Sequence, residues 1–330
     1  MNNSYMVAAL NALSHVNIKK NYKLIRKARR IARKPKIKLY QTWDYSIKCR
    51  KRRIPVRIFS PCSEFIPAED MRKYPVIVFF HGGGWVTGDL DTYEKTCLTI
   101  ARQTDHVVVA VQYRLAPEHP FPAGLSDCCA AVKTISRLCK KGDEFKKITL
   151  MGDSAGGNLV AAVCLYMRDR GKSVTDIVER QILIYPATYN DHTKNSPFKS
   201  VKDFGKDYIL TSQHIRDYMD MYCMDMQYSR EKSPARNSPY LAPLLAKDLS
   251  GLPQTLIITA EFDPLRDEGE EYGRRLREAG NTVEVHRIGN ALHGYFALSI
   301  RYSLVKETYD IINNFIRGDF NGQSSRKKVV

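Results

Sequence analysis

Residues 148–157 read Ile-Thr-Leu-Met-Gly-Asp-Ser-Ala-Gly-Gly, and this stretch decides how the rest of the chain is interpreted. Its apolar start predicts a buried strand, and residues 158–170 after it predict a helix. Glycines flank Ser154 because a serine in a sharp strand-to-helix turn leaves no room for neighbouring side chains. The N–H groups of the following helix would favour a developing anion at that serine. The alternative is a glycine-rich turn in which the serine is incidental.

Similar apolar runs recur before and after this motif and alternate with helical patterns. Such alternation predicts right-handed crossovers and a mostly parallel central sheet with helices on both faces. The expected strands are Ile54–Phe59, Val76–Phe80, Val107–Val111, Gln181–Tyr185, Thr255–Thr259 and, as an edge-like strand, Thr282–His286. The other expected helices are Thr92–Gln103, Gly124–Lys140 and Gly269–Ala279.

The alternation predicts three segments and one insertion. Residues 1–53 are expected to form a basic N-terminal arm with cap helices, residues 54–320 the α/β domain, and residues 321–330 a polar tail. No convincing strand lies between Pro186 and Leu252, so a helical cap insertion is expected at about 187–251.

The positive charge of the chain is concentrated in its first 57 residues. The 330 residues carry a net charge of +17, and residues 1–57 hold 17 Lys and Arg against the single acid Asp44. The remainder is therefore close to neutral, and no specific nucleic-acid partner is expected. Residues 17–34 place apolar side chains at helical spacing. Two accounts stay open: a cap helix, or weak, salt-dependent contact of residues 17–57 with an anionic surface.

Cysteine usage and hydropathy indicate the cellular compartment in which the protein is expected. The eight cysteines contain no C-x-x-C pair, and the basic residues near the N-terminus follow the short apolar stretch, an order unlike that of a secretory signal. No apolar run reaches the roughly 18–20 residues that a membrane-spanning helix needs. We therefore expect reduced thiols and a cytoplasmic location.

A second glycine-rich motif, His81-Gly-Gly-Gly-Trp85, ends one of the predicted strands. Consecutive glycines let a backbone approach a ligand and present bare N–H groups. Beside a nucleophile these groups would form an oxyanion hole, completed by the N–H of Ala155. A phosphate-binding loop fits poorly, because neither G-K-[ST] nor G-x-G-x-x-G is present. His81 itself is expected to anchor the loop.

A nucleophilic serine needs a base, and the base needs an acid to orient it. His293 follows the last predicted strand, on the side where strands place functional groups, and is the expected base. Asp263 follows the strand before it and is the expected acid. Asp267 and Glu268 are its rivals, but they suit the first turn of the next helix.

These motifs together resemble the hormone-sensitive-lipase-like branch of the α/β-hydrolase superfamily, which includes many microbial carboxylesterases. The resemblance covers about residues 54–314 and also rests on residues 113–123 (Tyr-Arg-Leu-Ala-Pro-Glu-His-Pro-Phe-Pro-Ala), on residues 263–267 and on His293-Gly294. It implies the α/β-hydrolase fold, with a cap built from the N-terminal helices and the insertion. It assigns Ser154 as nucleophile, His293 as base, Asp263 as orienting acid, and the N–H groups of Gly82, Gly83 and Ala155 as the oxyanion hole.

The resulting expectation is a serine carboxylester hydrolase acting on small-molecule esters with short acyl chains, with no metal or organic cofactor implied. One alternative is a catalytically inactive module of the same fold that binds a small ligand. Another is an anionic-surface-binding protein that works through its basic arm. A homo-oligomer is left open.

Overall fold

The central strands form where the sequence is apolar without interruption, since a strand covered on both faces has no solvent side. In the computed structural model β3 (Val76–Phe80), β4 (Val107–Val111) and β7 (Ile148–Asp153) are almost wholly buried. The structure describes residues 14–32, 42–49, 52–62, 74–141, 144–145, 148–171, 174–224 and 234–318. The expected tail at 321–330 and much of the expected arm lie outside these residues.

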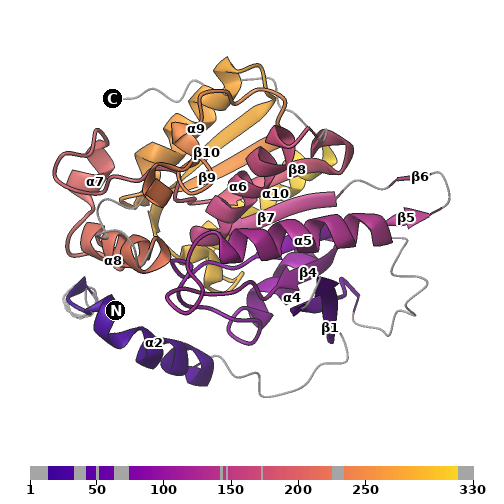
Figure 1. Cartoon of the computed structure of the whole chain (residues 1–330), viewed down its shortest axis with the longest axis horizontal. Coiled ribbons are helices and arrows are strands. Elements are labelled where there is room, and N and C mark those ends of the chain that lie inside the picture. The colour runs from indigo at the N-terminus through magenta and orange to yellow at the C-terminus, as the bar shows by residue number, and fades with distance from the viewer. Residues whose placement is uncertain are drawn as a thin grey trace.

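One eight-stranded sheet runs through the molecule in the order β1-β2-β4-β3-β7-β8-β9-β10 (Figure 1). Six neighbouring strands pair in parallel, in the order β4, β3, β7, β8, β9 and β10. β1 and β2 form an antiparallel hairpin, and β2 also pairs antiparallel with β4. The prediction of a mostly parallel sheet with β10 at its edge is confirmed. The remaining strands of this sheet are β1 (Thr42–Cys49), β2 (Arg52–Phe59), β8 (Val178–Ile184), β9 (Gln254–Phe262) and β10 (Val283–Leu292), and a small separate ribbon pairs β5 (Lys140–Lys141) with β6 (Glu144–Phe145).

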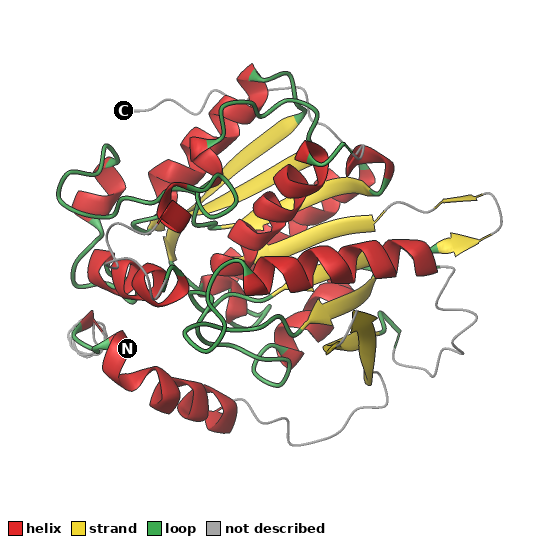
Figure 2. Cartoon of the chain, in the orientation of Figure 1, coloured by secondary structure: helices red, strands yellow, loops and turns green. Residues whose placement is uncertain are grey.

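Helices cover both faces of the sheet and create two apolar cores (Figure 2). Successive side chains of a strand point to opposite faces, so Val78 and Phe80 join one core while Ile77 and Phe79 join the other. The first core lies under α5 (Ala123–Leu138), α6 (Ala155–Asp169) and α9 (Arg266–Glu278), and the second under α4 (Glu94–Thr104) and α10 (Ser303–Arg317).

The expected arm of residues 1–53 is not helical throughout. Residues 42–49 form strand β1, which pairs along its whole length with β2. Because the hairpin extends the main sheet, this part of the basic segment belongs to the α/β domain, and the expectation of cap helices is wrong there. The segment also contributes helix α2 (Ile18–Ala32), which contacts α8 (Ser212–Tyr222).

Ionic contacts fasten α2 to the rest of the molecule. Lys19 Nζ lies 3.1 Å from Asp217 and 2.5 Å from Asp220, both on α8. Arg26 donates to the Glu118 carboxylate at 2.9 Å and to the carbonyl oxygens of residues 86 and 116. The buried side chain of Ile18 completes the contact, so α2 is held by specific partners.

Between β8 and β9 the described residues form no strand, as expected for the insertion. They contain α7 (Lys199–Asp203), α8 and two short 3-10 helices, Pro234–Asn237 and Pro243–Leu245. In Figure 1 α8 lies next to α2, and α7 lies on the far side of α8 from α2. The segment of residues 187–251 is called the insertion below. None of the described helices is long and apolar enough to cross a membrane.

Gly156 offers a test of the packing between α6 and β3. A Cβ atom added there would lie 2.0 Å from the carbonyl oxygen of Phe80, and that backbone cannot yield without disturbing the sheet. Gly156→Ala should therefore lower the free energy of unfolding by about 3 kcal/mol or more, measured by denaturant titration. Gly289→Ala is the control, because its nearest neighbour would be a side-chain oxygen at 3.9 Å. Equal stability of both variants would contradict this account.

Candidate active site

Three side chains from distant parts of the chain meet at the carboxyl edge of the sheet. Ser154 follows β7, Asp263 follows β9 and His293 follows β10. His293 Nε2 lies 3.0 Å from Ser154 Oγ, and His293 Nδ1 lies 2.6 Å from Asp263 Oδ2. The parallel strands end at one edge, so loops 139 residues apart in sequence become neighbours.

The backbone of Ser154 is strained in the way that its glycine neighbours predict. Its φ of 55° and ψ of −121° are rare for a residue with a side chain. A Cβ at Gly152 would lie 2.4 Å from the backbone of Gly156, so neither position admits a larger residue. The turn projects the serine hydroxyl from the sheet edge towards His293. It also makes Ala155 the first residue of α6, where its N–H lacks an intrahelical acceptor.

Asp263 is held rigidly behind the histidine. Its side chain is fully buried, and its Oδ1 accepts a hydrogen bond of 2.9 Å from the N–H of Leu265. The other oxygen faces His293 Nδ1, so the imidazole presents Nε2 to the serine. The two rival acids are engaged elsewhere: Asp267 accepts from the N–H of Ser200 at 2.7 Å, and Glu268 lies against His192 at 2.6 Å.

The glycine loop after β3 lies beside the serine, but one of its expected donors is already used. The Gly82 N–H donates to Asp153 Oδ1 at 2.8 Å and approaches the Tyr93 hydroxyl at 3.1 Å. The expectation that Gly82 donates to an oxyanion is therefore contradicted. Gly83 and Gly84 line the cavity that contains Ser154, and no acceptor among the described residues binds their N–H groups.

Asp153 and Tyr93 are residues whose role sequence reasoning missed. The Tyr93 hydroxyl donates to Asp153 Oδ2 at 3.0 Å, so both carboxylate oxygens are used to brace the glycine loop. Burial raises the pKa of Asp153, while these hydrogen bonds and nearby positive charge oppose that rise. The available signal was the position of Asp153 inside the Gly152–Gly157 motif, directly before Ser154.

His81 anchors the same loop, as expected. Its ring is buried, stacks on Tyr113 with centroids 4.4 Å apart, and lies 2.9 Å from the Gly82 carbonyl oxygen through Nδ1. Burial lowers the pKa of His81 to about 4. The ring is therefore neutral at physiological pH, and its Nδ1–H donates to that carbonyl.

Two chambers meet at His293, and the first of them is also lined by Ser154. The first has a volume of about 300 Å³ and extends from the glycine loop beneath α2 and α8. The second has about 350 Å³ and continues past His293 along residues 290–304. The roof of the first belongs to distant segments: the Tyr218 ring of α8 lies where a Cβ of Gly84 would be, and Tyr222 stacks on Trp85 with ring centroids 4.7 Å apart.

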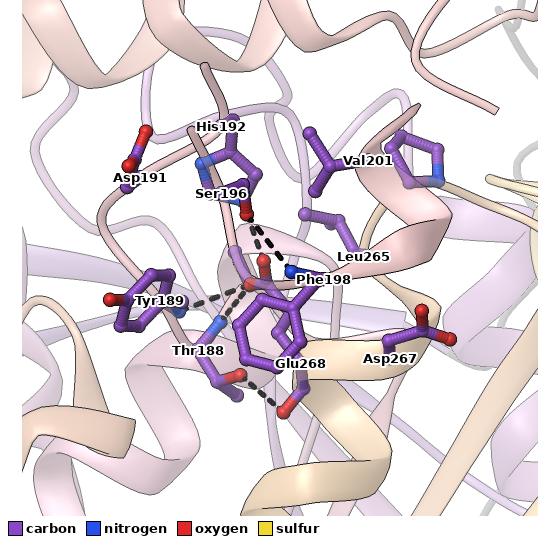
Figure 3. A network of polar contacts seen from close by, with 12 residues as sticks. Thr188, Tyr189, Asp191, His192, Ser196, Phe198, Val201, Leu265, Asp267 and Glu268 are labelled. Atoms are coloured by element: carbon purple, nitrogen blue, oxygen red, sulfur yellow. Dashed lines mark hydrogen bonds and ion pairs between the residues drawn. The ribbon is translucent and has the colours of Figure 1, made fainter. Parts of the chain in front are cut away.

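A buried polar network fastens the insertion to the helix that follows Asp263 (Figure 3). The Glu268 carboxylate on α9 accepts from the N–H groups of Thr188 and Tyr189 at 2.6 and 3.1 Å, and His192 Nε2 lies 2.6 Å away. Both side chains of the Glu268–His192 pair are fully buried. Ser200 adds a second attachment through Asp267, so α9 holds both the acid loop and the insertion.

Comparison with known proteins agrees with this geometry. Residues 77–297 match the family model described as the alpha/beta hydrolase fold. The chain therefore belongs to the α/β-hydrolase family, in its hormone-sensitive-lipase-like branch.

The similar proteins are ester hydrolases. The chain is 41% identical over 231 residues to the carboxylic ester hydrolase LipN of Mycobacterium tuberculosis, a match that covers 68% of this chain and 58% of LipN. It is 33% identical over 271 residues to the arylesterase of Saccharolobus solfataricus, covering 79% of each protein. The solved esterase of Pyrobaculum calidifontis superposes with a TM-score of 0.78 at 32% identity, over 96% of this chain and 97% of that one. The chain is an ester-hydrolysing enzyme of this family.

The buried Glu268–His192 pair offers a stability test with a matched control. Glu268→Ala leaves the buried N–H of Thr188, the partly buried N–H of Tyr189 and the buried His192 without their acceptor, so it should lower the free energy of unfolding by about 3 kcal/mol or more. Glu284→Ala removes a similar pair, with His286, whose side chains are 27% and 39% exposed. That control should change the unfolding free energy by less than about 1 kcal/mol. Equal losses in the two denaturation curves would show that burial of the network is unimportant.

Proposed function

We propose that the enzyme hydrolyses carboxylic esters through a Ser154–His293–Asp263 triad and a covalent acyl-enzyme. The observation that carries the proposal is the unbroken series of contacts from Asp263 to His293 at 2.6 Å and from His293 to Ser154 at 3.0 Å. A nucleophile, a base and an orienting acid within hydrogen-bond reach are the requirement for this chemistry.

The proposed reaction proceeds in two halves. Ser154 Oγ attacks the ester carbonyl carbon while His293 Nε2 accepts the hydroxyl proton, and the negative charge of Asp263 stabilises the imidazolium that forms. Collapse of the tetrahedral intermediate breaks the bond to the alcohol oxygen, which takes the proton from His293. Water then attacks the acyl-enzyme with the same assistance and releases the acid.

For the oxyanion hole we propose the N–H groups of Gly83, Gly84 and Ala155, in place of the Gly82 and Gly83 pair expected from the sequence. Support comes from the cavity lining, which includes all three residues, and from the engagement of the Gly82 N–H by Asp153. Preorganised donors matter because each one lost costs about 3 kcal/mol of transition-state stabilisation. The role of Asp153 is then to hold the loop so that its next two N–H groups face the intermediate.

A short acyl chain is the proposed preference. The first chamber has about 300 Å³, near the lower end of the roughly 300–1,000 Å³ range of ligand sites, and its lining is mostly apolar. Residues from α2 and the insertion form its roof, which supports the cap role of both segments.

The alternatives have less support. An inactive binding module does not need the triad contacts that this chain retains. Lys19 and Arg26 of α2 are engaged in ion pairs, which favours the cap account over docking on an anionic surface. Surface contact through residues 17–57, a homo-oligomer and a cytoplasmic location stay predictions.

Covalent labelling tests the nucleophile. An organophosphonate should label the enzyme stoichiometrically at Ser154, because phosphorus attacked by the serine mimics the tetrahedral intermediate. Ser154→Ala should abolish both labelling, read by intact-mass spectrometry, and turnover of 4-nitrophenyl butyrate. His293→Ala should reduce turnover nearly as much, since triad members act as a unit. Labelling that persists in Ser154→Ala would refute the assignment.

Paired substitutions distinguish the acid from its neighbour. Asp263→Asn should lower kcat by about 10⁴-fold, because the amide stabilises the wrong imidazole tautomer. Asp267→Asn should keep most of the activity and act mainly on stability, through its contacts with Ser200 and Arg266. Steady-state kinetics and thermal unfolding of both variants check this, and a reversed pattern would identify the wrong acid.

A further inference from the structure

Arg29 is a charged residue on α2 whose contacts do not explain its position. Arg29 is an exposed residue that also lines both chambers, although α2 lies more than 100 residues before Ser154 in the sequence. Among the described residues its recorded polar contact is one hydrogen bond of 3.0 Å to the Thr87 hydroxyl. Arginine carries five N–H donors, so most of its capacity remains available at the cavity.

Arg26, one helical turn earlier, behaves differently. It donates to the Glu118 carboxylate through two nitrogens and also to two backbone carbonyl oxygens, and these contacts account for its place on α2. Attachment of the helix is thus achieved by Arg26 and Lys19. Arg29 is left with a charge that no carboxylate among the described residues neutralises by an ion pair.

Arg29 differs in charge from the other residues that line the first chamber. The first chamber is lined mainly by apolar side chains such as Ile18, Ile25 and Ile215. Its one carboxylate besides the triad, Asp153, has both oxygens engaged by Gly82 and Tyr93. Burial lowers the pKa of the other lining imidazole, His214, so that ring is neutral at physiological pH. Arg29 is therefore the permanent cation among the described residues that line the two chambers.

Its connection to the catalytic loop is short. The Thr87 hydroxyl that accepts from Arg29 itself donates to the carbonyl oxygen of Gly83 at 3.0 Å. The guanidinium thus lies two hydrogen bonds from the backbone that is proposed to bind the oxyanion. Arg29 and Ser154 line the same chamber, so one small molecule that fills it contacts both residues.

We propose that Arg29 is a specificity-determining residue that selects esters carrying a carboxylate in addition to the ester bond. The inference rests on the proposed function, because it assigns a substrate class to the same site. The carboxylate would accept charge-assisted, bidentate hydrogen bonds from the guanidinium, which are stronger at the mouth of an apolar cavity than in open water. Because Arg29 borders both chambers, the carboxylate belongs either to the acyl part or to the alcohol part of the ester.

The test compares charged and neutral esters of matched shape. For the acyl side, kcat/KM for 4-nitrophenyl hydrogen adipate is divided by that for 4-nitrophenyl methyl adipate. For the alcohol side, the pair is 3-acetoxybenzoate and its methyl ester. In at least one pair, Arg29→Gln should lower the charged-to-neutral ratio by about fivefold or more, mainly through KM, as loss of one charge-assisted contact requires. Arg29→Lys should retain an intermediate ratio, since it keeps the charge without the bidentate geometry.

Lys23→Gln is the matched control. It removes one exposed positive charge from the same helix at a residue outside the lining of both chambers, so the ratio should stay unchanged. The inference is overturned if Arg29→Gln changes both ratios by less than about twofold, or if Lys23→Gln lowers them equally. Turnover of the neutral esters distinguishes a failure of this inference from a failure of the proposed function. If the enzyme hydrolyses them through Ser154 and Arg29→Gln changes neither ratio, the proposed function stands and this inference is wrong.

Discussion

The close approach between the first turn of α6 and the end of β3 is the constraint on which the active site depends. Gly156 leaves so little space that an added Cβ would fall 2.0 Å from the Phe80 carbonyl oxygen. This contact brings the serine turn and the glycine loop, which begins at His81, to the same point of the sheet edge. Ser154 then adopts a backbone conformation that few residues with side chains tolerate, and the surrounding packing sustains that strain.

Buried polar groups convert this arrangement into a rigid site. Asp153 uses both oxygens to hold the glycine loop, and Asp263 uses one oxygen for its own loop and the other for His293. Each carboxylate is thus satisfied by hydrogen bonds, as buried polar groups must be. The two aspartates act on different groups in the proposed reaction. Asp153 holds the loop whose backbone N–H groups would bind the oxyanion, and Asp263 stabilises the positive charge that develops on the His293 imidazole.

Apolar packing and charged contacts together attach the insertion and α2 to this core, since Ile18, Ile215 and Leu241 belong to its main apolar cluster. Glu268 and Asp267 connect the insertion to α9, and Lys19 connects α2 to α8. The chamber between the core and this roof has a volume of about 300 Å³ and is lined by residues of both. Attachment of α2 also brings Arg29 to the chamber, where its charge is a feature of the roof and not of the triad.

Sequence patterns alone predicted the sheet, the serine turn, and the proposed triad residues Ser154, Asp263 and His293 in their order along the chain. Those features depend on local patterns: apolar runs form buried strands, and functional side chains directly follow them at the end where parallel strands meet. Strand β1 was missed because its polar alternation is that of an exposed edge strand within a basic segment. The three-dimensional arrangement was needed to show that Gly82 donates to Asp153, that Lys19 and Arg26 are anchors and that Arg29 lines the chambers. These assignments depend on contacts between residues roughly 60 to 200 positions apart, whose distances and directions no local pattern encodes.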